Sequence, residues 1–375
     1  MADNNENKVL NVPHLRFPEF TEEWVNVSLK DVADFQKERI SSGLLDESTY
    51  ISTENILQNF QGVQSAISIP ANTNVVAYKK NDILLSNIRP YLKKVWFSDR
   101  IGGCSADVFV LRSKTCEPEF LYNVIASDKF INYVMSGAKG VKMPRGDKNQ
   151  MESFSFSIPA VVEQRKISRL FQLLDERIVT QNKIIEDLKK LKSAIRKKMF
   201  SFLKDEYTES FEINQLLDYE QPTAYIVAND EYSTDTSLTP VLTANKGFIL
   251  GYTDEKFGIY QKGECIIFDD FTMDAKYVSF PFKVKSSAIK ILTAKPNVNL
   301  RFMFEYLSYW ELKSEEHKRH YISEIASLVI ELPSKERQSI IASLMTSLNS
   351  KLDIEAKTKI RYEEQKRYLL SQMFI

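Results

Sequence analysis

Three acidic residues close to a β-rich run are the side chains of this sequence best placed to do chemistry. Asp269 and Asp270 end the run that begins at Glu264, and Asp274 lies four residues further on. Clustered carboxylates can hold a divalent metal ion, and such an ion could support cleavage of a phosphodiester bond. No convincing Glu-x-Lys partner lies in a matching strand, so we favour turn capping or a base contact over catalysis for these residues.

The other reactive residue types do not assemble into a familiar active site. His14 lies in the N-terminal region, and His317 and His320 lie in a basic stretch without nearby cysteines, so a zinc site is not expected. The chain has no G-x-x-x-x-G-K-[ST] loop, no G-x-G-x-x-G fingerprint after a strand and no G-x-S-x-G elbow. We therefore expect no catalytic residue, no metal and no bound cofactor, in a subunit that works for other proteins.

Length, charge and cysteine content narrow the class of protein. The 375 residues predict two or three domains, and a formal net charge of zero excludes a uniformly basic nucleic-acid binder but not a local basic surface. Cys104, Cys116 and Cys265 are few and far apart, which fits free thiols in a reducing compartment. With no apolar run of membrane-spanning length and a polar start, we expect a cytoplasmic protein with a disordered N-terminal tail.

The chain repeats itself once. Residues 157–201 and 331–375 align without gaps, so that Pro159 meets Pro333 and Gln164 meets Gln338. Each copy follows a strand-like run that ends in proline, and no further proline or glycine interrupts it. Each copy is therefore predicted to be one long helix of about 40 residues, roughly 60 Å in length.

Apolar side chains at intervals of three and four form a narrow stripe along both helices, which is typical of a coiled-coil seam. Two separate surface helices would leave such a stripe exposed to aggregation, so the second copy is the expected partner of the first. Antiparallel pairing would relate the two halves by a pseudo-two-fold axis. The predicted pairing residues are Ile167, Leu170, Leu174, Ile178, Ile185, Leu188, Leu191, Ile195 and Met199 in the first helix, and Ile341, Leu344, Leu348, Leu352, Leu369 and Met373 in the second.

The segments before the two helices predict mixed α/β domains with the same order of elements. Short β-rich runs at 82–86, 94–97 and 107–111 precede a helical pattern at 119–135, and runs at 264–269, 277–280 and 288–292 precede one at 300–312. We therefore expect an α+β fold with two mixed α/β domains joined by an antiparallel pair of long helices. The predicted boundaries are a tail at 1–11, a first domain at 12–158, a first helix at 159–205, a second domain at 206–332 and a second helix at 333–375.

Basic residues gather in loops at corresponding places of the two domains, around 86–96 and 139–148 and around 270–277 and 317–321. Loops that combine Lys or Arg with Gly and an aromatic residue suit DNA phosphates and base edges. Ordinary solvated charge is the alternative for any single residue, but the correspondence favours double-stranded DNA. The candidate DNA-binding residues are Ser86, Asn87, Arg89, Lys93, Lys94, Lys139, Lys142, Arg145, Lys148, Thr272, Lys276, Tyr277, Lys318, Arg319, His320 and Tyr321.

Charge is distributed unevenly along the chain. Residues 206–270 carry 13 acidic residues against three lysines, and such a surface would repel DNA or face a protein partner. Residues 161–204 carry 12 basic against five acidic residues, which could attract DNA without regard to sequence or could be the solvated flank of a coiled coil.

Three segments resemble the specificity subunits of type I restriction–modification enzymes. They are the opening Val12-Pro-His-Leu-Arg-Phe-Pro-Glu-Phe20 with Trp24 and Ser28-Leu29, Ile158-Pro159 with Glu163-Gln164 and Ile167, and Leu332-Pro333 with Gln338 and Ile341. The resemblance covers the organisation of the whole chain. The short, acidic second domain and the polar middle of the second helix, 355–359, depart from it.

The resemblance implies two target recognition domains, each of which reads one half of a bipartite DNA site. The paired helices would set the spacer and dock two methyltransferase subunits, and motor–nuclease subunits would complete the enzyme. S-adenosylmethionine, ATP and Mg²⁺ would belong to those partners, with adenine N6 methylation as the expected modification. A coiled-coil scaffold that binds proteins instead of DNA, and a lone nuclease, remain the alternatives; the target sequence cannot be read from the chain.

Overall fold

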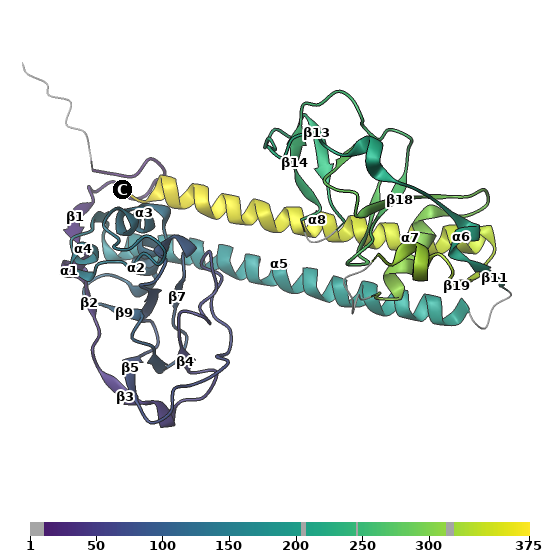
Figure 1. The fold of residues 1–375 in the computed structure, drawn as a ribbon. Coiled ribbons are helices and arrows are strands. Elements are labelled where there is room, and N and C mark those ends of the chain that lie inside the picture. Colours follow the sequence, from purple (N-terminus) through teal and green to yellow (C-terminus); the bar gives the residue numbers. More distant parts are fainter. Residues whose placement is uncertain (1–10, 204–207, 245–246, 313–318) are drawn as a thin grey trace, which may run out of the picture. The chain divides into compact units, whose positions relative to one another are not determined.

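The protein, described by a computed structural model over residues 11–203, 208–244, 247–312 and 319–375, divides into two compact units. Unit 1 comprises Met1–Asn182 and Thr358–Ile375, and unit 2 comprises Lys183–Lys357. Two long helices, α5 (Val161–Phe202) and α8 (Lys335–Met373), each contribute one half to unit 1 and the other half to unit 2 (Figure 1). Each unit therefore combines one predicted α/β domain with half of each predicted helix.

Unit 1 contains two four-stranded sheets and one two-stranded ladder. The first sheet has the order β2-β9-β6-β7 and is antiparallel throughout, and the second has the order β3-β5-β8-β4 with β4 parallel to β8. The ladder pairs β1 with β10, which leads directly into α5. The bounds are β1 (Val25–Ser28), α1 (Leu29–Val32), β2 (Ala33–Phe35), β3 (Arg39–Ser41), β4 (Tyr50–Ile51), β5 (Asn74–Tyr78), β6 (Ile83–Ser86), η2 (Pro90–Leu92), β7 (Val95–Phe97), β8 (Gly102–Cys104), β9 (Val108–Ser113), α2 (Pro118–Ile125), α3 (Asp128–Ser136), α4 (Lys148–Glu152) and β10 (Ser155–Ile158).

Unit 2 repeats this plan with fewer strands. Its main sheet, β12-β18-β15-β16, matches the main sheet of unit 1 strand for strand, a second sheet has the order β14-β13-β17, and β11 pairs with β19 ahead of α8. The sequence predicts the same order of elements in the two domains, and their main sheets have the same strand order. The bounds are β11 (Glu209–Glu212), α6 (Ile213–Leu216), β12 (Leu217–Glu220), η4 (Pro222–Tyr225), β13 (Thr239–Leu242), β14 (Ile249–Thr253), β15 (Cys265–Asp269), β16 (Ala275–Val278), β17 (Lys283–Val284), β18 (Ile289–Ala294), α7 (Leu300–Tyr309), η5 (Tyr321–Ile325) and β19 (Val329–Leu332).

The two long helices pair antiparallel within each unit. In unit 1 the ring of Phe171 lies 5.7 Å from that of Phe374, and one turn further along α5 Asp175 accepts from Lys366 at 2.6 Å. Residue numbers therefore rise along α5 as they fall along α8. In unit 2 the later half of α5 packs against the early half of α8 in one core, which contains Phe200 and Ile341.

Most of the predicted stripe is buried or half-buried where the helices meet, with two corrections. Leu344 is 40% exposed, and the neighbouring Met345 is fully buried in its place. The seam follows Ile341, Met345 and Leu348. Spacing alone could not place Leu344, because Ile341, Leu344 and Leu348 also keep intervals of three and four. Leu191 is likewise exposed. The predicted residues in the cores are Ile167, Leu170, Leu174, Leu369 and Met373 in unit 1 and Ile195, Met199, Ile341 and Leu348 in unit 2, and Ile178, Ile185, Leu188 and Leu352 are half-buried.

The repeated glutamine explains why both copies begin in the same way. Gln164 donates through Nε2 to the Pro159 carbonyl at 2.8 Å and accepts at Oε1 from the backbone N–H of Glu117, the residue that caps α2, at 2.9 Å. Gln338 makes the same two bonds, to the carbonyl of Pro333 and from the N–H of Asn299 ahead of α7, both at 2.9 Å. Both side chains are buried. Each glutamine thus joins the start of a long helix to the start of the preceding short one.

Two local predictions need correction. The helical pattern at 119–135 forms two helices, because Ser127 takes an extended conformation and its hydroxyl accepts the N–H of Phe130, which starts α3. The strand predicted at 277–280 is β16, which begins and ends two residues earlier so that it pairs with β15. Of the predicted tail, only Asn11 lies within the described residues.

The three cysteines are free and buried. Burial raises the pKa of the Cys104 and Cys265 thiols to about 12, which makes them poor nucleophiles. None of the helices in the described part of the chain has the length and apolarity needed to cross a membrane.

Candidate nucleic-acid interface

The two basic loops predicted for the first domain meet in unit 1. The loop after β6 and the loop ahead of α4 are joined by two backbone hydrogen bonds, from the Arg89 N–H to the Pro144 carbonyl at 2.7 Å and from the Gly146 N–H to the Asn87 carbonyl at 2.9 Å. Residues that are 55 and 59 positions apart in the sequence therefore form one surface, held by backbone atoms at the end of a buried strand.

The second of these loops closes as a small hairpin. The N–H of Lys139 donates to the carbonyl of Arg145 at 3.0 Å, and the N–H of Arg145 donates back at 2.9 Å. Gly140 adopts a positive φ of 98°, which favours glycine at this turn. Beneath the hairpin, the hydrogen bond from Lys139 to Asp147 is the main cause that lowers the pKa of the Asp147 carboxyl.

The guanidinium of Arg145 is presented at the edge of this surface. It donates to Asp107 at 2.5 Å and lies 3.5 Å from the Asn87 side-chain oxygen, and its side chain remains 49% exposed. Arg89 and Lys142 are also exposed. The arrangement holds an oriented guanidinium and two further cations on one face, which suits phosphates and the acceptor edges of bases.

Three apolar side chains of the same face escaped the sequence prediction. Tyr91 is 48% exposed, Met143 is 47% exposed and Val141 is fully exposed. The signal that could have found them is the alternation of apolar and basic residues in Lys139-Gly-Val-Lys-Met143, inside a loop that contains glycine.

Four predicted residues of unit 1 are engaged in packing. Lys93 pairs with Asp128 at 2.5 Å, and Lys94 donates to the Thr53 carbonyl, with burial lowering the pKa of its ammonium. Ser86 is buried and donates to the Ile88 carbonyl at 3.0 Å, so its hydroxyl shapes the turn and does not face a ligand. The fourth, Lys148, lies over the ring of Phe35 and pairs with Glu152.

Unit 2 places Arg319 where unit 1 places Arg145. In unit 1 the N–H that follows Arg145 donates to the carbonyl of Asn87, the first residue after β6. In unit 2 the N–H of His320, which follows Arg319, donates to the carbonyl of Asp270, the first residue after β15, at the same length of 2.9 Å. Arg319 is exposed and lies over the ring of Phe271 at 5.9 Å.

A buried ion pair supports this part of unit 2. Asp270 pairs with Lys290 at 3.3 Å and accepts the backbone N–H of Tyr321 at 2.7 Å, and both charged side chains are almost completely buried. Burial also raises the pKa of the Tyr321 hydroxyl. The prediction that the His320 and Tyr321 side chains contact DNA is incompatible with their burial, because both pack beneath the turn that presents Arg319.

The acidic group considered for catalysis has structural roles. Asp269 accepts the backbone N–H groups of Phe271 and Thr272 at 2.9 Å each, which is the turn capping that the sequence favoured. Asp274 accepts from the Thr272 hydroxyl at 3.2 Å. Within the described ranges, no three His, Cys, Asp or Glu side chains gather closely enough to hold a metal ion.

Of the remaining predicted DNA-binding residues of unit 2, only some lie on the exposed surface that carries Arg319. Thr272 is exposed in the same turn. Tyr277 is covered by the guanidinium of Arg301 at 4.0 Å, and the positive charge of Lys276 helps to lower the pKa of Lys192 on α5, after the larger effect of burial. Tyr277 therefore faces α7, and Lys276, the preceding residue of the strand, is half-buried. Lys318, like His317, lies outside the described residues.

The acidic segment 206–270 is partly compensated inside unit 2, where, among the described residues, five of its 13 carboxylates form ion pairs with lysines. These lysines mostly follow the segment in the sequence, so that the net charge counted along the chain overstates the charge of the surface. The pairs are Asp218–Lys295 at 3.5 Å, Glu220–Lys262 at 2.8 Å, Asp230–Lys285 at 2.5 Å, Glu255–Lys283 at 2.6 Å and Asp270–Lys290 at 3.3 Å.

The opening segment, residues 12–20, packs on the paired helices of unit 1. Arg16 forms two hydrogen bonds of 2.7 Å with the buried carboxylate of Glu163, and Lys166 lies 4.5 Å from the centre of the Phe17 ring. The N–H of Leu15 donates to the Gln372 carbonyl at 3.0 Å. The opening segment therefore holds the start of α5 and the end of α8 together within unit 1.

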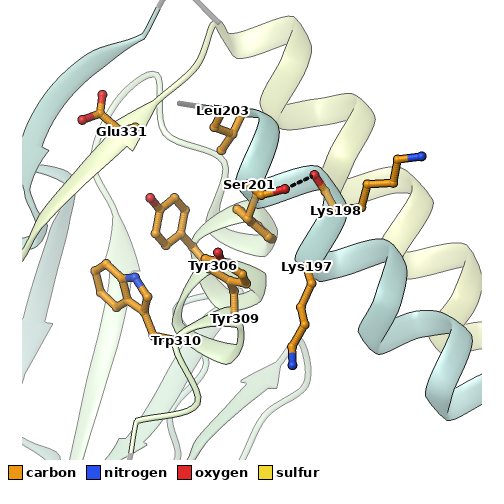
Figure 2. Close-up of a pocket in the computed structure, with 9 residues that line it drawn as sticks. Lys197, Lys198, Ser201, Leu203, Tyr306, Tyr309, Trp310 and Glu331 are labelled. Atoms are coloured by element: carbon orange, nitrogen blue, oxygen red, sulfur yellow. Dashed lines mark hydrogen bonds between the residues drawn. The ribbon is translucent and has the colours of Figure 1, made fainter. Parts of the chain in front are cut away.

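Unit 2 has an open groove of about 610 Å³. It lies between the ends of α5 and α7, beside Glu331 of β19. Figure 2 shows the aromatic side chains Tyr306, Tyr309 and Trp310 on one side and the end of α5 on the other, where the Ser201 hydroxyl donates to the Lys198 carbonyl.

The sequence model of the type I restriction modification DNA specificity domain matches residues 21–190 and 205–364. The chain belongs to this family. The two matches fall one in each half, in agreement with the duplication of topology, and each includes the strands and loops that carry Arg145 or Arg319.

Relatives and a solved structure agree with this assignment. The specificity subunit of the type I restriction enzyme EcoR124I/EcoR124II from Escherichia coli is 39% identical over 178 residues, which are 42% of this chain and 43% of that protein. The MjaVIII specificity subunit from Methanocaldococcus jannaschii is 27% identical over 192 residues, 50% of this chain and 43% of that protein. The matches thus span less than half the length of both relatives. The S subunit of a type I restriction-modification system from M. genitalium has the same fold, with a TM-score of 0.65 over 97% of this chain and 99% of that chain at 15% identity.

Proposed function

We propose that this specificity-family chain is the non-catalytic DNA-reading subunit of a type I restriction–modification complex. Unit 1 reads one half of a bipartite target and unit 2 reads the other half. The observation that carries the proposal is the equivalent position of Arg145 and Arg319, each held at the end of a buried strand by the same backbone bond in one of two duplicated folds. Arginine is the side chain that most often reads guanine in the major groove.

The partners follow from the same proposal. The paired helices dock two methyltransferase subunits, and motor–nuclease subunits join to complete the enzyme. S-adenosylmethionine, ATP and Mg²⁺ bind to those subunits and not to this chain. The supporting observation within the described residues concerns the acidic cluster at 269–274. There Asp269 accepts backbone N–H groups of the turn and Asp270 forms an ion pair with Lys290.

Exchange of either arginine for alanine tests the assignment of the half-sites. We expect Arg145→Ala to weaken or relax reading of one half-site by about 1–3 kcal/mol, the worth of one good base contact, and to leave the other half-site intact. Arg319→Ala should affect the opposite half-site. Methylome sequencing of cells that carry each variant with the full set of subunits measures both halves at once.

The outcomes separate DNA reading from the alternatives. Equal loss at both half-sites in both variants would indicate misfolding or a phosphate contact. A wild-type complex without salt-dependent, sequence-selective DNA affinity in a gel-shift series would instead favour a protein-binding scaffold.

The shared helices predict control of the spacer between the half-sites. Four residues inserted into α5 after Asn182 and four into α8 after Lys357 lengthen both helices by about 6 Å. At about 3.4 Å per base pair, we expect the non-specific spacer to grow by one or two base pairs while both half-sites stay the same. An unchanged spacer in the methylome of the insertion variant would remove the helices as the ruler.

A further inference from the structure

The tip of the hairpin at 139–145 carries an apolar side chain in a position that the fold does not use. Val141 is fully exposed, and Met143 beside it is 47% exposed. The hairpin is fixed at its base by the reciprocal bonds between Lys139 and Arg145 and is tied to the neighbouring loop through the carbonyl of Pro144. Val141 and Met143 are exposed together with Tyr91 on the two joined loops, and a group of exposed apolar side chains with polar neighbours is typical of an interaction site.

The surroundings of Val141 identify the chemistry of that ligand. The side chains nearest in sequence and in the joined loops include four cations. Lys139 pairs with Asp147 and Arg145 pairs with Asp107, whereas Arg89 and Lys142 are exposed and make this face basic. A polyanion is therefore drawn to this face, and the apolar side chain must meet an apolar group of the same polyanion. In the major groove of DNA the accessible apolar group on a base edge is the 5-methyl of thymine.

We propose that Val141 contacts the 5-methyl group of a thymine in the half-site read by unit 1. The inference rests on the proposed function. It names the side chain that would recognise a methyl group, which the basic residues cannot recognise through hydrogen bonds. Lys142 supplies attraction to the phosphates, and Arg145 supplies a hydrogen-bonding contact. Val141 distinguishes thymine from a base that lacks the methyl group.

Uracil scanning tests the contact directly. The target is first read from the methylome, and duplexes of that sequence are then made with each thymine replaced in turn by deoxyuridine, which lacks only the methyl group. Fluorescence anisotropy with the complex of this chain and its methyltransferase subunits gives the affinity for each duplex. One replacement in the unit 1 half-site should weaken binding by about fourfold, the worth of burying one methyl-sized group.

The variant Val141→Ala closes a double-mutant cycle. Its affinity for the thymine duplex should fall to about that of the wild-type complex for the uracil duplex, and the effect of uracil at that position should nearly vanish. Lys142→Ala is the matched control on the same tip. It should weaken all duplexes alike and reduce the salt dependence, with the uracil effect unchanged.

Several outcomes would overturn the contact. They are a flat uracil scan in the wild-type complex, a uracil effect that persists in Val141→Ala, a unit 1 half-site without thymine, and a Val141→Ala variant that reads DNA normally but fails to bind its methyltransferase subunits. The last would assign the tip to a protein interface. A wild-type complex that shows no preference for the target over unrelated DNA would instead contradict the proposed function itself.

Discussion

Replacement of Lys290 by methionine is expected to destabilise unit 2 by about 3–5 kcal/mol, because it leaves the carboxylate of Asp270 buried without its counter-charge. Both side chains of the pair are almost completely buried, so solvent cannot compensate for the loss. Asp270 also accepts the N–H of Tyr321 and thereby fixes the turn that presents Arg319. Hydrogen–deuterium exchange measures this loss of stability, because peptides from β15 and β18 should exchange faster when the sheet opens more often.

A second variant shows that the unpaired charge is responsible. In Lys290→Met/Asp270→Asn, the asparagine oxygen can still accept the N–H of Tyr321, but the buried charge is gone. This double variant should regain most of the lost protection. If it opens as fast as Lys290→Met alone, the destabilisation comes from packing around Lys290, and the ion pair is not its cause.

Replacement of Gln164 by leucine is expected to destabilise unit 1 by about 2–6 kcal/mol. The substitution leaves the buried carbonyl of Pro159 and the N–H of Glu117 unpaired, at about 1–3 kcal/mol for each group. Urea unfolding is followed by limited proteolysis, and fragments from unit 1 and unit 2 are counted separately. This gives the change in the free energy of unfolding for each unit. Gln338→Leu should produce the same loss in unit 2.

The control for this prediction lies on the same helix. Gln172 is exposed on α5, and Gln172→Leu should change the stability of unit 1 by less than about 0.5 kcal/mol. Comparable losses for Gln164→Leu and Gln172→Leu would show that added apolarity on α5, and not the loss of the two buried bonds, determines the result.

Features that depend on local sequence were predictable in this chain. The two long helices, three of the four strands of the main sheet in each unit and the repeated glutamine follow from periodicity, from proline positions and from self-similarity. Gln164 and Gln338 could be recognised as equivalent, but the partners of their amides could not, because Glu117 and Asn299 lie about 40 residues away in the sequence.

Features that depend on which strands become neighbours were not predictable. Part of the acidic charge at 206–270 is neutralised by lysines that are distant in the sequence, and only the folded unit reveals those pairs. For the same reason His320 and Tyr321 read as part of an exposed basic cluster although they are packed beneath it. Arg145 and Arg319, at the ends of the same connection in each unit, stayed exposed as the sequence suggested.

The division of α5 and α8 between the units has a consequence for synthesis on the ribosome. Unit 2 is one continuous stretch, Lys183–Lys357, and all of it can emerge and close while translation continues. Unit 1 begins first but finishes last, because Phe120 and Phe171 pack against Phe374, at ring distances of 5.2 and 5.7 Å. The nascent first half must therefore wait, with an unfinished core, until the second half is complete. A premature stop codon within the last turns of α8 would damage the fold of unit 1 and spare that of unit 2.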